Sequence, residues 1–105
     1  MVLRKLTKHD RYLLDLCDQL NGKYDKVYTN LLFKNSKRVI AEADIVSTKD
    51  DLIDVYEVKC SKRIIKAKKQ LMKIRRILEN TLKEQNNYRF FFYCGSSKEI
   101  IEVEK

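Results

Sequence analysis

The stretch "DVYEVKC", residues 54–60, decides the fold, because it has the pattern of a strand and also carries charges. Val55 and Val58 are β-branched residues of the kind that pack well on a pleated sheet. Glu57 and Lys59 lie among them, and a charge in an apolar run costs free energy unless it is paired, bound to a metal or hydrated. Alternate residues of a strand share a face, so Glu57 and Lys59 point the same way, about 7 Å apart.

The runs around this stretch predict the order α-β-β-β-α-β, with a further strand at the end. Residues 26–33, 38–47 and 52–60 are β-rich and are joined by short polar turns, which favours an antiparallel meander. Residues 88–94 have the pattern of a strand buried on both faces, and residues 99–103 predict an edge strand. A helix between two strands allows the fourth strand to run parallel to an earlier one by a right-handed crossover. We therefore expect an α/β fold with a mixed central sheet flanked by helices.

Two amphipathic helices are predicted. Thr7 and Asp10 have the spacing of a capping box, and Gly22 favours the end of the first helix. The second helix is predicted to begin near Ser61. The apolar stripes are Leu13, Leu16, Cys17 and Leu20 in the first helix, and Ile64, Ala67, Leu71, Ile74 and Leu78 in the second. The other face of the second helix is basic, and we expect the following residues to bind nucleic-acid phosphates: Lys62, Arg63, Lys66, Lys69, Lys73 and Arg76.

Length and composition predict a basic single domain over residues 1–105. Lys and Arg number 23 against 15 for Asp and Glu, and the net charge of +8 attracts polyanions. Nucleic acid is the first candidate partner and an anionic membrane surface the second, while ordinary solubility charge is the remaining explanation. No apolar run approaches the roughly 20 residues that span a bilayer, and no signal region is evident. We therefore expect a cytoplasmic location, which includes a host cytoplasm.

The cysteines and the single histidine exclude two kinds of site. Cys17, Cys60 and Cys94 are widely spaced and odd in number, so a disulfide framework is not expected. His9 is the one histidine, and no spacing typical of zinc ligands occurs. We expect the cysteines to be free thiols that pack as small apolar side chains.

Acids on two neighbouring strands point to a metal site. Glu42, Asp44 and Val46 share one face of the preceding strand, so Asp44 can lie beside Glu57 across the ladder. A one-residue slip in register would instead separate them. Two such carboxylates suit a hard divalent ion such as Mg²⁺, which stabilises the charge that develops on phosphorus. Lys59 would then hold the attacking hydroxide or offset the charge of the phosphate.

The arrangement of these residues resembles that of the PD-(D/E)xK nucleases, also called restriction-endonuclease-like nucleases. Asp44 within "EADIV" and Glu57-Val58-Lys59 within "YEVKCS" match the acid and the (D/E)xK triplet of that family. The resemblance covers residues 7–94 and is nearest to small archaeal Holliday junction resolvases. It implies an αβββαβ restriction-endonuclease-like core. It also implies that Asp44, Glu57 and Lys59 are catalytic and that Asp44 and Glu57 bind Mg²⁺ or Mn²⁺.

Two features depart from the family pattern. Ala43 stands where the motif has proline, and the first helix lacks the glutamate that the family usually places near the metal. Asp10 or Asp15 would have to serve as that catalytic acid. Asp10 fits better because apolar residues follow it, although a capping-box acid explains it equally well. The residues that could support the site are Glu42, Ser61 and Gln70. Gln70 resembles a glutamine of many family members, but exposure to solvent on a polar face explains it equally well. For Glu42, the simpler explanation is a surface residue of the strand.

The resemblance and the charge together predict a Mg²⁺-dependent endodeoxyribonuclease, either structure-selective, as a Holliday junction resolvase is, or non-specific. The alternative is a nucleic-acid-binding protein on the same fold without catalysis, which the missing helix glutamate favours. A solvated Glu57–Lys59 pair on an edge strand would require neither function. The expected partner is double-stranded or branched DNA and not a membrane. A homodimer is an open possibility, because resolving a junction takes two nicks.

Overall fold

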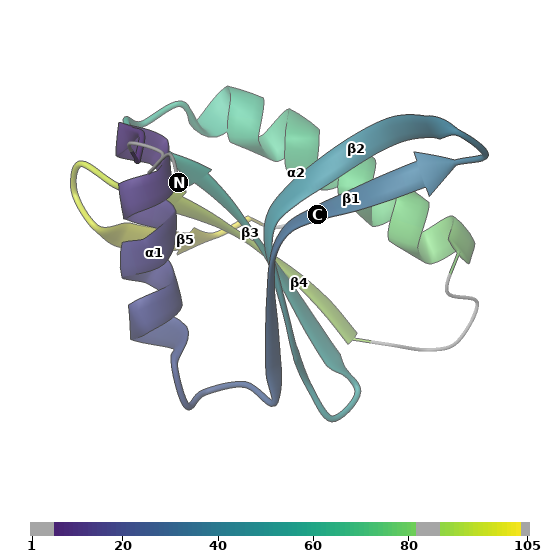
Figure 1. Ribbon diagram of the computed structural model, residues 1–105, viewed down its shortest axis with the longest axis horizontal. Helices are drawn as coiled ribbons and strands as arrows, with labels where there is room; N and C mark the ends of the chain where they lie inside the picture. The colour runs from purple at the N-terminus through teal and green to yellow at the C-terminus, as the bar shows by residue number, and fades with distance from the viewer. Residues whose placement is uncertain (1–5, 82–86, 104–105) are drawn as a thin grey trace, which may run out of the picture.

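The computed structural model describes residues 6–81 and 87–103, which form one mixed sheet with two helices (Figure 1). The elements are α1 (Lys8–Leu20), β1 (Lys26–Asn35), β2 (Arg38–Lys49), β3 (Leu52–Lys59), α2 (Ile64–Thr81), β4 (Asn87–Cys94) and β5 (Glu99–Glu102). The strands lie in the order β1-β2-β3-β4-β5, and β3 and β4 are parallel while the other pairs are antiparallel. The predicted α/β class, the meander and the parallel fourth strand are confirmed.

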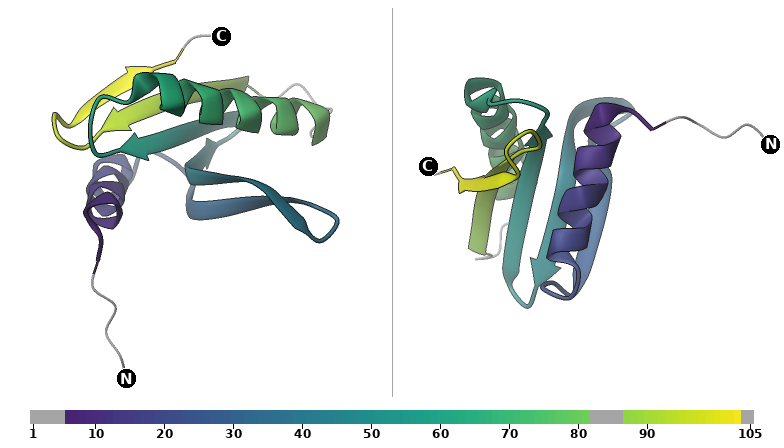
Figure 2. Two further views of the ribbon diagram at one scale, coloured as in Figure 1. Left: turned by 90° about the horizontal axis from the view of Figure 1, so that it is seen from above. Right: turned by 90° about the vertical axis from the view of Figure 1, so that its left-hand side faces the viewer.

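The two helices cover opposite faces of the sheet, as the two views of Figure 2 show. The face under α2 holds the larger apolar cluster, in which Leu71 and Ile74 pack against Val55 and Phe92. The face under α1 holds a second cluster, which includes Leu16. The apolar stripes predicted for both helices therefore face the sheet.

The ends of the helices follow local signals. Thr7 Oγ1 accepts a hydrogen bond from the Asp10 amide, and Asp10 Oδ2 accepts one from the Thr7 amide, both at 3.1 Å, so the predicted capping box is present. Gly22 follows the helix with a φ of 82°, in the left-handed region that favours glycine. The predicted start of the second helix near Ser61 is wrong. The Ser61 carbonyl accepts a hydrogen bond from the Arg63 amide at 2.7 Å, which forms a tight turn, and α2 begins after this turn at Ile64.

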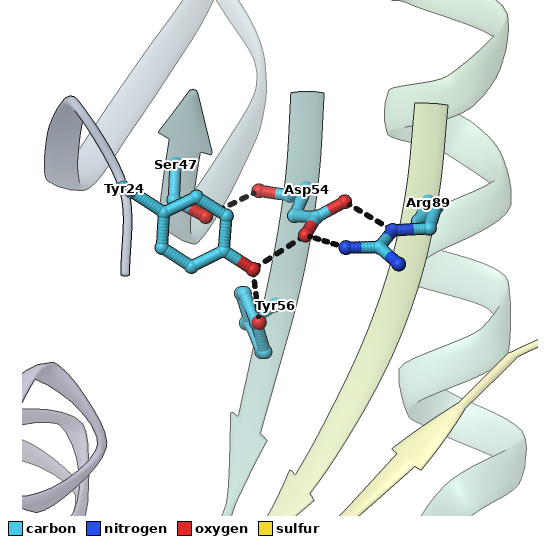
Figure 3. Close-up of polar contacts among 5 residues, drawn as sticks. All are labelled: Tyr24, Ser47, Asp54, Tyr56 and Arg89. Carbon is cyan, nitrogen blue, oxygen red and sulfur yellow. Dashed lines mark hydrogen bonds and ion pairs between the residues drawn. The ribbon is translucent and has the colours of Figure 1, made fainter. Parts of the chain in front are cut away.

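A buried polar network holds the sheet at the N-terminal end of β3 (Figure 3). Asp54 is fully buried and accepts hydrogen bonds from Arg89 of β4 and from the Tyr24 hydroxyl. The Tyr24 and Tyr56 hydroxyls are 2.7 Å apart, and the Ser47 hydroxyl donates to the Asp54 carbonyl at 3.2 Å. No local pattern in the sequence indicates this role of Asp54. Its charge is tolerated inside the sheet because it is paired and hydrogen-bonded.

The hairpin of β1 and β2 separates from the rest of the sheet at its outer half, as the left view of Figure 2 shows. The β2–β3 ladder begins at the pair Ile45↔Tyr56, whereas β2 continues to pair with β1 through Ala43 and beyond. Ile45 packs in the cluster under α1, but Ala43 packs in the cluster under α2. The strand therefore twists between these two residues, and Asp44 lies at the fork.

The cysteines are free thiols, as expected. Cys94 is buried, as expected for a thiol that packs as a small apolar side chain. Cys17 and Cys60 are only half-buried. Neither helix within the described ranges has the length and the apolar character to cross a membrane.

Candidate functional site

A pocket of about 950 Å³ opens at the fork between β2 and β3. Its size lies at the upper end of the range of small-molecule sites. The first turn of α1 forms one side and α2 forms another. The pocket is lined by His9, Asp10, Asn30, Glu42, Asp44, Glu57, Lys59, Lys66, Lys69, Gln70 and Lys73. Residues far apart in the sequence, including both predicted metal ligands, therefore meet in one place.

The carboxyl groups of Asp44 and Glu57 face the same pocket and interact with each other. Ile45 and Tyr56 are the last paired residues of the β2–β3 ladder, and Asp44 and Glu57 are the next residues of the two strands. The Val58 amide donates to Asp44 Oδ2 at 2.8 Å, which fixes the Asp44 carboxylate. The register that the sequence left open is therefore the one that joins the two acids on the same face.

Burial and the neighbouring acid change the chemistry of Glu57. Its residue is 5% exposed, and burial together with Asp44 raises the pKa of the Glu57 carboxyl to about 9. The ammonium of Lys59 acts in the opposite direction and lowers that pKa. Without a further cation, the protonated form of Glu57 is thus favoured over the ionised form. Two carboxylates this close require additional positive charge to be ionised together.

The lysines of the pocket supply cations that can bind an anion. Lys59 lies at the end of β3, and Lys66, Lys69 and Lys73 project from α2. Within the described part of the chain, none of these four ammonium groups makes an ion pair. They can therefore bind phosphate without first breaking an internal contact.

His9 lines the pocket, although the motifs of the sequence assign it no role there. Its Nε2 lies 3.0 Å from the Val58 carbonyl oxygen and 3.4 Å from Asp44 Oδ2. The imidazole thus connects the first turn of α1 to both acid-bearing strands. One feature of the sequence does point to His9. It precedes Asp10, at the start of the helix that the family resemblance places near the metal.

The contacts of Asp10 and Gln70 bear on the roles that the sequence leaves open for them. Asp10 lines the pocket and is also the acid of the capping box, so its carboxyl group faces the site from the start of α1. Gln70 Nε2 donates to the Glu42 carbonyl at 2.8 Å and so ties α2 to the outer half of β2. Gln70 is therefore a structural connection at the site and is not simply hydrated.

The predicted phosphate-binding residues are distributed over three hollows. Lys66, Lys69 and Lys73 line the pocket. Arg76 lines a neighbouring hollow that shares Lys69 and Lys73 with it. Lys62 and Arg63 line a third hollow at the start of α2, and Lys62 forms a 3.6 Å ion pair with Glu99. These three residues and Ser61 do not line the pocket that holds the acids.

The carboxylates of the pocket are the donors that a divalent cation would use. Among the residues that the structure describes, no group of three or more His, Cys, Asp and Glu side chains is arranged to hold a metal ion. The pair Asp44 and Glu57 supplies oxygen donors from two rigid strands. Mg²⁺ commonly uses one or two carboxylates and completes its shell with water and substrate phosphate. The pair therefore fits such an ion by the chemistry of its donors.

Comparisons of this chain with protein-family models, with curated proteins and with solved structures gave no match in any of the three.

Proposed function

We propose that this chain is a divalent-metal-dependent nuclease that hydrolyses phosphodiester bonds of DNA, on the PD-(D/E)xK core that its sequence resembles. The observation that carries the proposal is the contact between the Asp44 and Glu57 carboxyl groups, in a pocket that also contains Lys59. The order α-β-β-β-α-β, with β4 parallel to β3, agrees with what the resemblance implies.

Each residue has a role that follows from its chemistry. Asp44 and Glu57 would hold Mg²⁺ or Mn²⁺ through carboxylate oxygens. The bound cation supplies Lewis-acid stabilisation of the negative charge that develops on the phosphate. Water attacks phosphorus and gives up a proton to solvent, the bond to the leaving oxygen breaks, and that oxygen takes up a proton from solvent. Lys59 orients the attacking water or offsets the charge of the phosphate.

The substrate is held mainly by α2. Lys66, Lys69 and Lys73 form a row of cations along one side of the pocket. A row of this kind binds phosphates through counterion release and reads no base sequence. These residues therefore support a non-specific or structure-selective endonuclease, including one that acts on branched DNA.

The test compares wild type with Lys59→Ala and Asp44→Ala on labelled duplex, single-stranded and four-way-junction DNA, with matching RNA substrates. Wild type is expected to cleave in Mg²⁺ or Mn²⁺ and to stop in EDTA, and both variants are expected to lose cleavage while their unfolding midpoints show that they fold. Wild-type cleavage that persists in EDTA, or wild type as inert as the variants, would rule out the proposed enzyme.

A second candidate is a nucleic-acid-binding protein without catalysis. The engagement of Asp10 in the capping box favours it, because the family usually places a further acid on this helix. This protein would bind DNA in a salt-dependent manner that neither Asp44→Ala nor EDTA changes. The same substrates, tested for binding and for cleavage side by side, separate the two candidates.

A further inference from the structure

Asn30 has an unusual backbone conformation for a residue inside a strand. Within the described ranges, the non-glycine residues with positive φ are Asn30, Ser36, Asp50 and Lys98. Three of them lie in the short turns between consecutive strands, where this conformation is common. Asn30 has a φ of 52° in the middle of β1. A left-handed residue in a strand is strained, and such strain often occurs at functional sites.

The position of Asn30 is opposite Asp44. The β1–β2 ladder pairs Thr29 with Ile45 and Leu31 with Ala43, and Asn30 and Asp44 lie between these pairs. The hairpin twists from the α1 side of the sheet to the α2 side at this level. The left-handed residue thus lies where the strand changes direction, and its side chain lines the pocket with Asp44 and Glu42.

The amide of Asn30 is available to a ligand. Its side chain makes no hydrogen bond within residues 6–81 and 87–103. An asparagine amide offers two N–H donors and one carbonyl acceptor. Being neutral, it can donate to a phosphate oxygen without forming an ion pair with Asp44 or Glu57. A lysine or arginine at this position would instead compete with a metal ion for those carboxylates.

We propose that Asn30 is a substrate-binding residue, whose side-chain amide donates a hydrogen bond to a phosphate oxygen of the nucleic-acid strand held by Lys69 and Lys73. The bound strand lies between two walls of the pocket, the cations of α2 and the amide of β1. This inference rests on the proposed function, because it assigns the ligand of the same pocket.

The test uses Asn30→Gly, which keeps the left-handed conformation at little cost and removes the amide. Ser36→Gly is the matched control, because it makes the same kind of change at a positive-φ residue that does not line the pocket. Binding of a labelled DNA duplex and a labelled single strand is measured by fluorescence anisotropy in EDTA, so that cleavage is not needed. Thermal unfolding of each variant shows whether the fold is intact.

Asn30→Gly is expected to bind about tenfold more weakly than wild type, the effect of one hydrogen bond to a charged group, while Ser36→Gly binds like wild type. Asn30→Asp keeps the shape and should bind more weakly still, because its charge repels phosphate. Equal binding by wild type and Asn30→Gly, with wild-type cleavage intact, overturns the role of Asn30 alone. A wild-type protein that binds neither DNA overturns the proposed function and this inference with it.

Discussion

Arg89 binds Asp54 through two parallel hydrogen bonds, from Nε to Oδ1 at 2.8 Å and from Nη2 to Oδ2 at 2.7 Å. The exposure of the two partners differs, since the Asp54 side chain is fully buried and that of Arg89 is 45% exposed. The hydrogen bonds to Asp54 raise the pKa of Arg89 above its ordinary value. Water can solvate Arg89 if Asp54 is removed, whereas it cannot reach Asp54 if Arg89 is removed.

Removing Arg89 is expected to destabilise the protein more than neutralising Asp54. Arg89→Met leaves a buried carboxylate with the Tyr24 hydroxyl as its remaining side-chain donor. It should cost about 2–3 kcal/mol, below the 3–5 typical of a fully buried pair because Arg89 is half exposed. Asp54→Asn keeps a hydrogen-bond acceptor and leaves a guanidinium that water can reach, so the cost should be about 1–2 kcal/mol. Urea unfolding measures both, and the reverse order would contradict this account of the network.

Gly95 is predicted to tolerate no side chain. A Cβ atom built at this position would lie 2.2 Å from the Tyr12 ring, well inside van der Waals contact. Gly95→Ala should therefore displace Tyr12 and α1 from the sheet and lower the free energy of unfolding by about 1–3 kcal/mol. Gly22→Ala is a useful comparison, since its cost would come from the positive φ and not from a clash.

The double variant Gly95→Ala with Tyr12→Ala checks the cause. If the clash is responsible, the alanine at position 95 should cost less in the Tyr12→Ala background than in wild type. Equal costs in the two backgrounds would show that the destabilisation comes from elsewhere.

Local patterns were sufficient to predict most of the fold. Burial on one face produces a periodic pattern of apolar residues that can be recognised in the sequence. Examples are the alternation in residues 52–60 and the helical spacing of Leu71, Ile74 and Leu78. Asp44 and Glu57 could be placed on neighbouring strands in advance because a short turn joins β2 and β3, but the register that brings them together could not. These predictions depend on residues close in the chain.

Contacts between segments that are far apart in the chain could not be predicted from local patterns. His9 reaches Val58 across 49 residues, and Arg89 reaches Asp54 across 35. The left-handed conformation of Asn30 occurs where the hairpin twists, and a β-rich run gives no sign of it. The sequence therefore indicates that the two acids can meet, but not that His9 and Asn30 line the same pocket.

The stability of the metal-free protein is expected to fall as pH rises. The pKa of Glu57 is raised from 4.5 to about 9 in the folded protein, so folding favours its protonated form. The contribution is complete below the unfolded pKa of about 4.5 and is lost as pH rises toward about 9. In EDTA, wild type should therefore lose stability relative to Glu57→Gln as pH rises through this window. A difference between the two proteins that does not change with pH would contradict the prediction.

Added Mg²⁺ should reverse this loss. A divalent cation that binds both carboxylates stabilises the folded state, and the effect should increase with pH because the cation requires Glu57 to be ionised. Thermal unfolding above neutral pH should show a shift with Mg²⁺ for wild type and a much smaller one for Glu57→Gln. Equal shifts would mean that the ion binds elsewhere on the protein.

His9 is expected to orient Asp44 for cleavage. His9→Ala removes the contacts with Asp44 and the Val58 carbonyl, and we expect cleavage to fall by about tenfold or more, as for other groups that orient metal ligands. His9→Gln retains an N–H donor and should recover part of the activity. The measurement is kcat/KM with a saturating metal concentration, together with the unfolding midpoint. Equal activity of the two variants would exclude a hydrogen-bonding role.

The lysines of α2 are expected to determine the salt dependence of DNA binding. Each phosphate contact that is lost should reduce the slope of log K against log salt by about 0.9 for duplex DNA. We expect this change for Lys69→Ala and again for Lys73→Ala, without a change in sequence preference, because neither lysine needs to contact a base. Lys23→Ala is the matched control, since Lys23 follows the end of α1 opposite to the pocket. A slope that Lys23→Ala lowers as much as Lys69→Ala would mean that the net charge of +8 attracts DNA without a defined binding face.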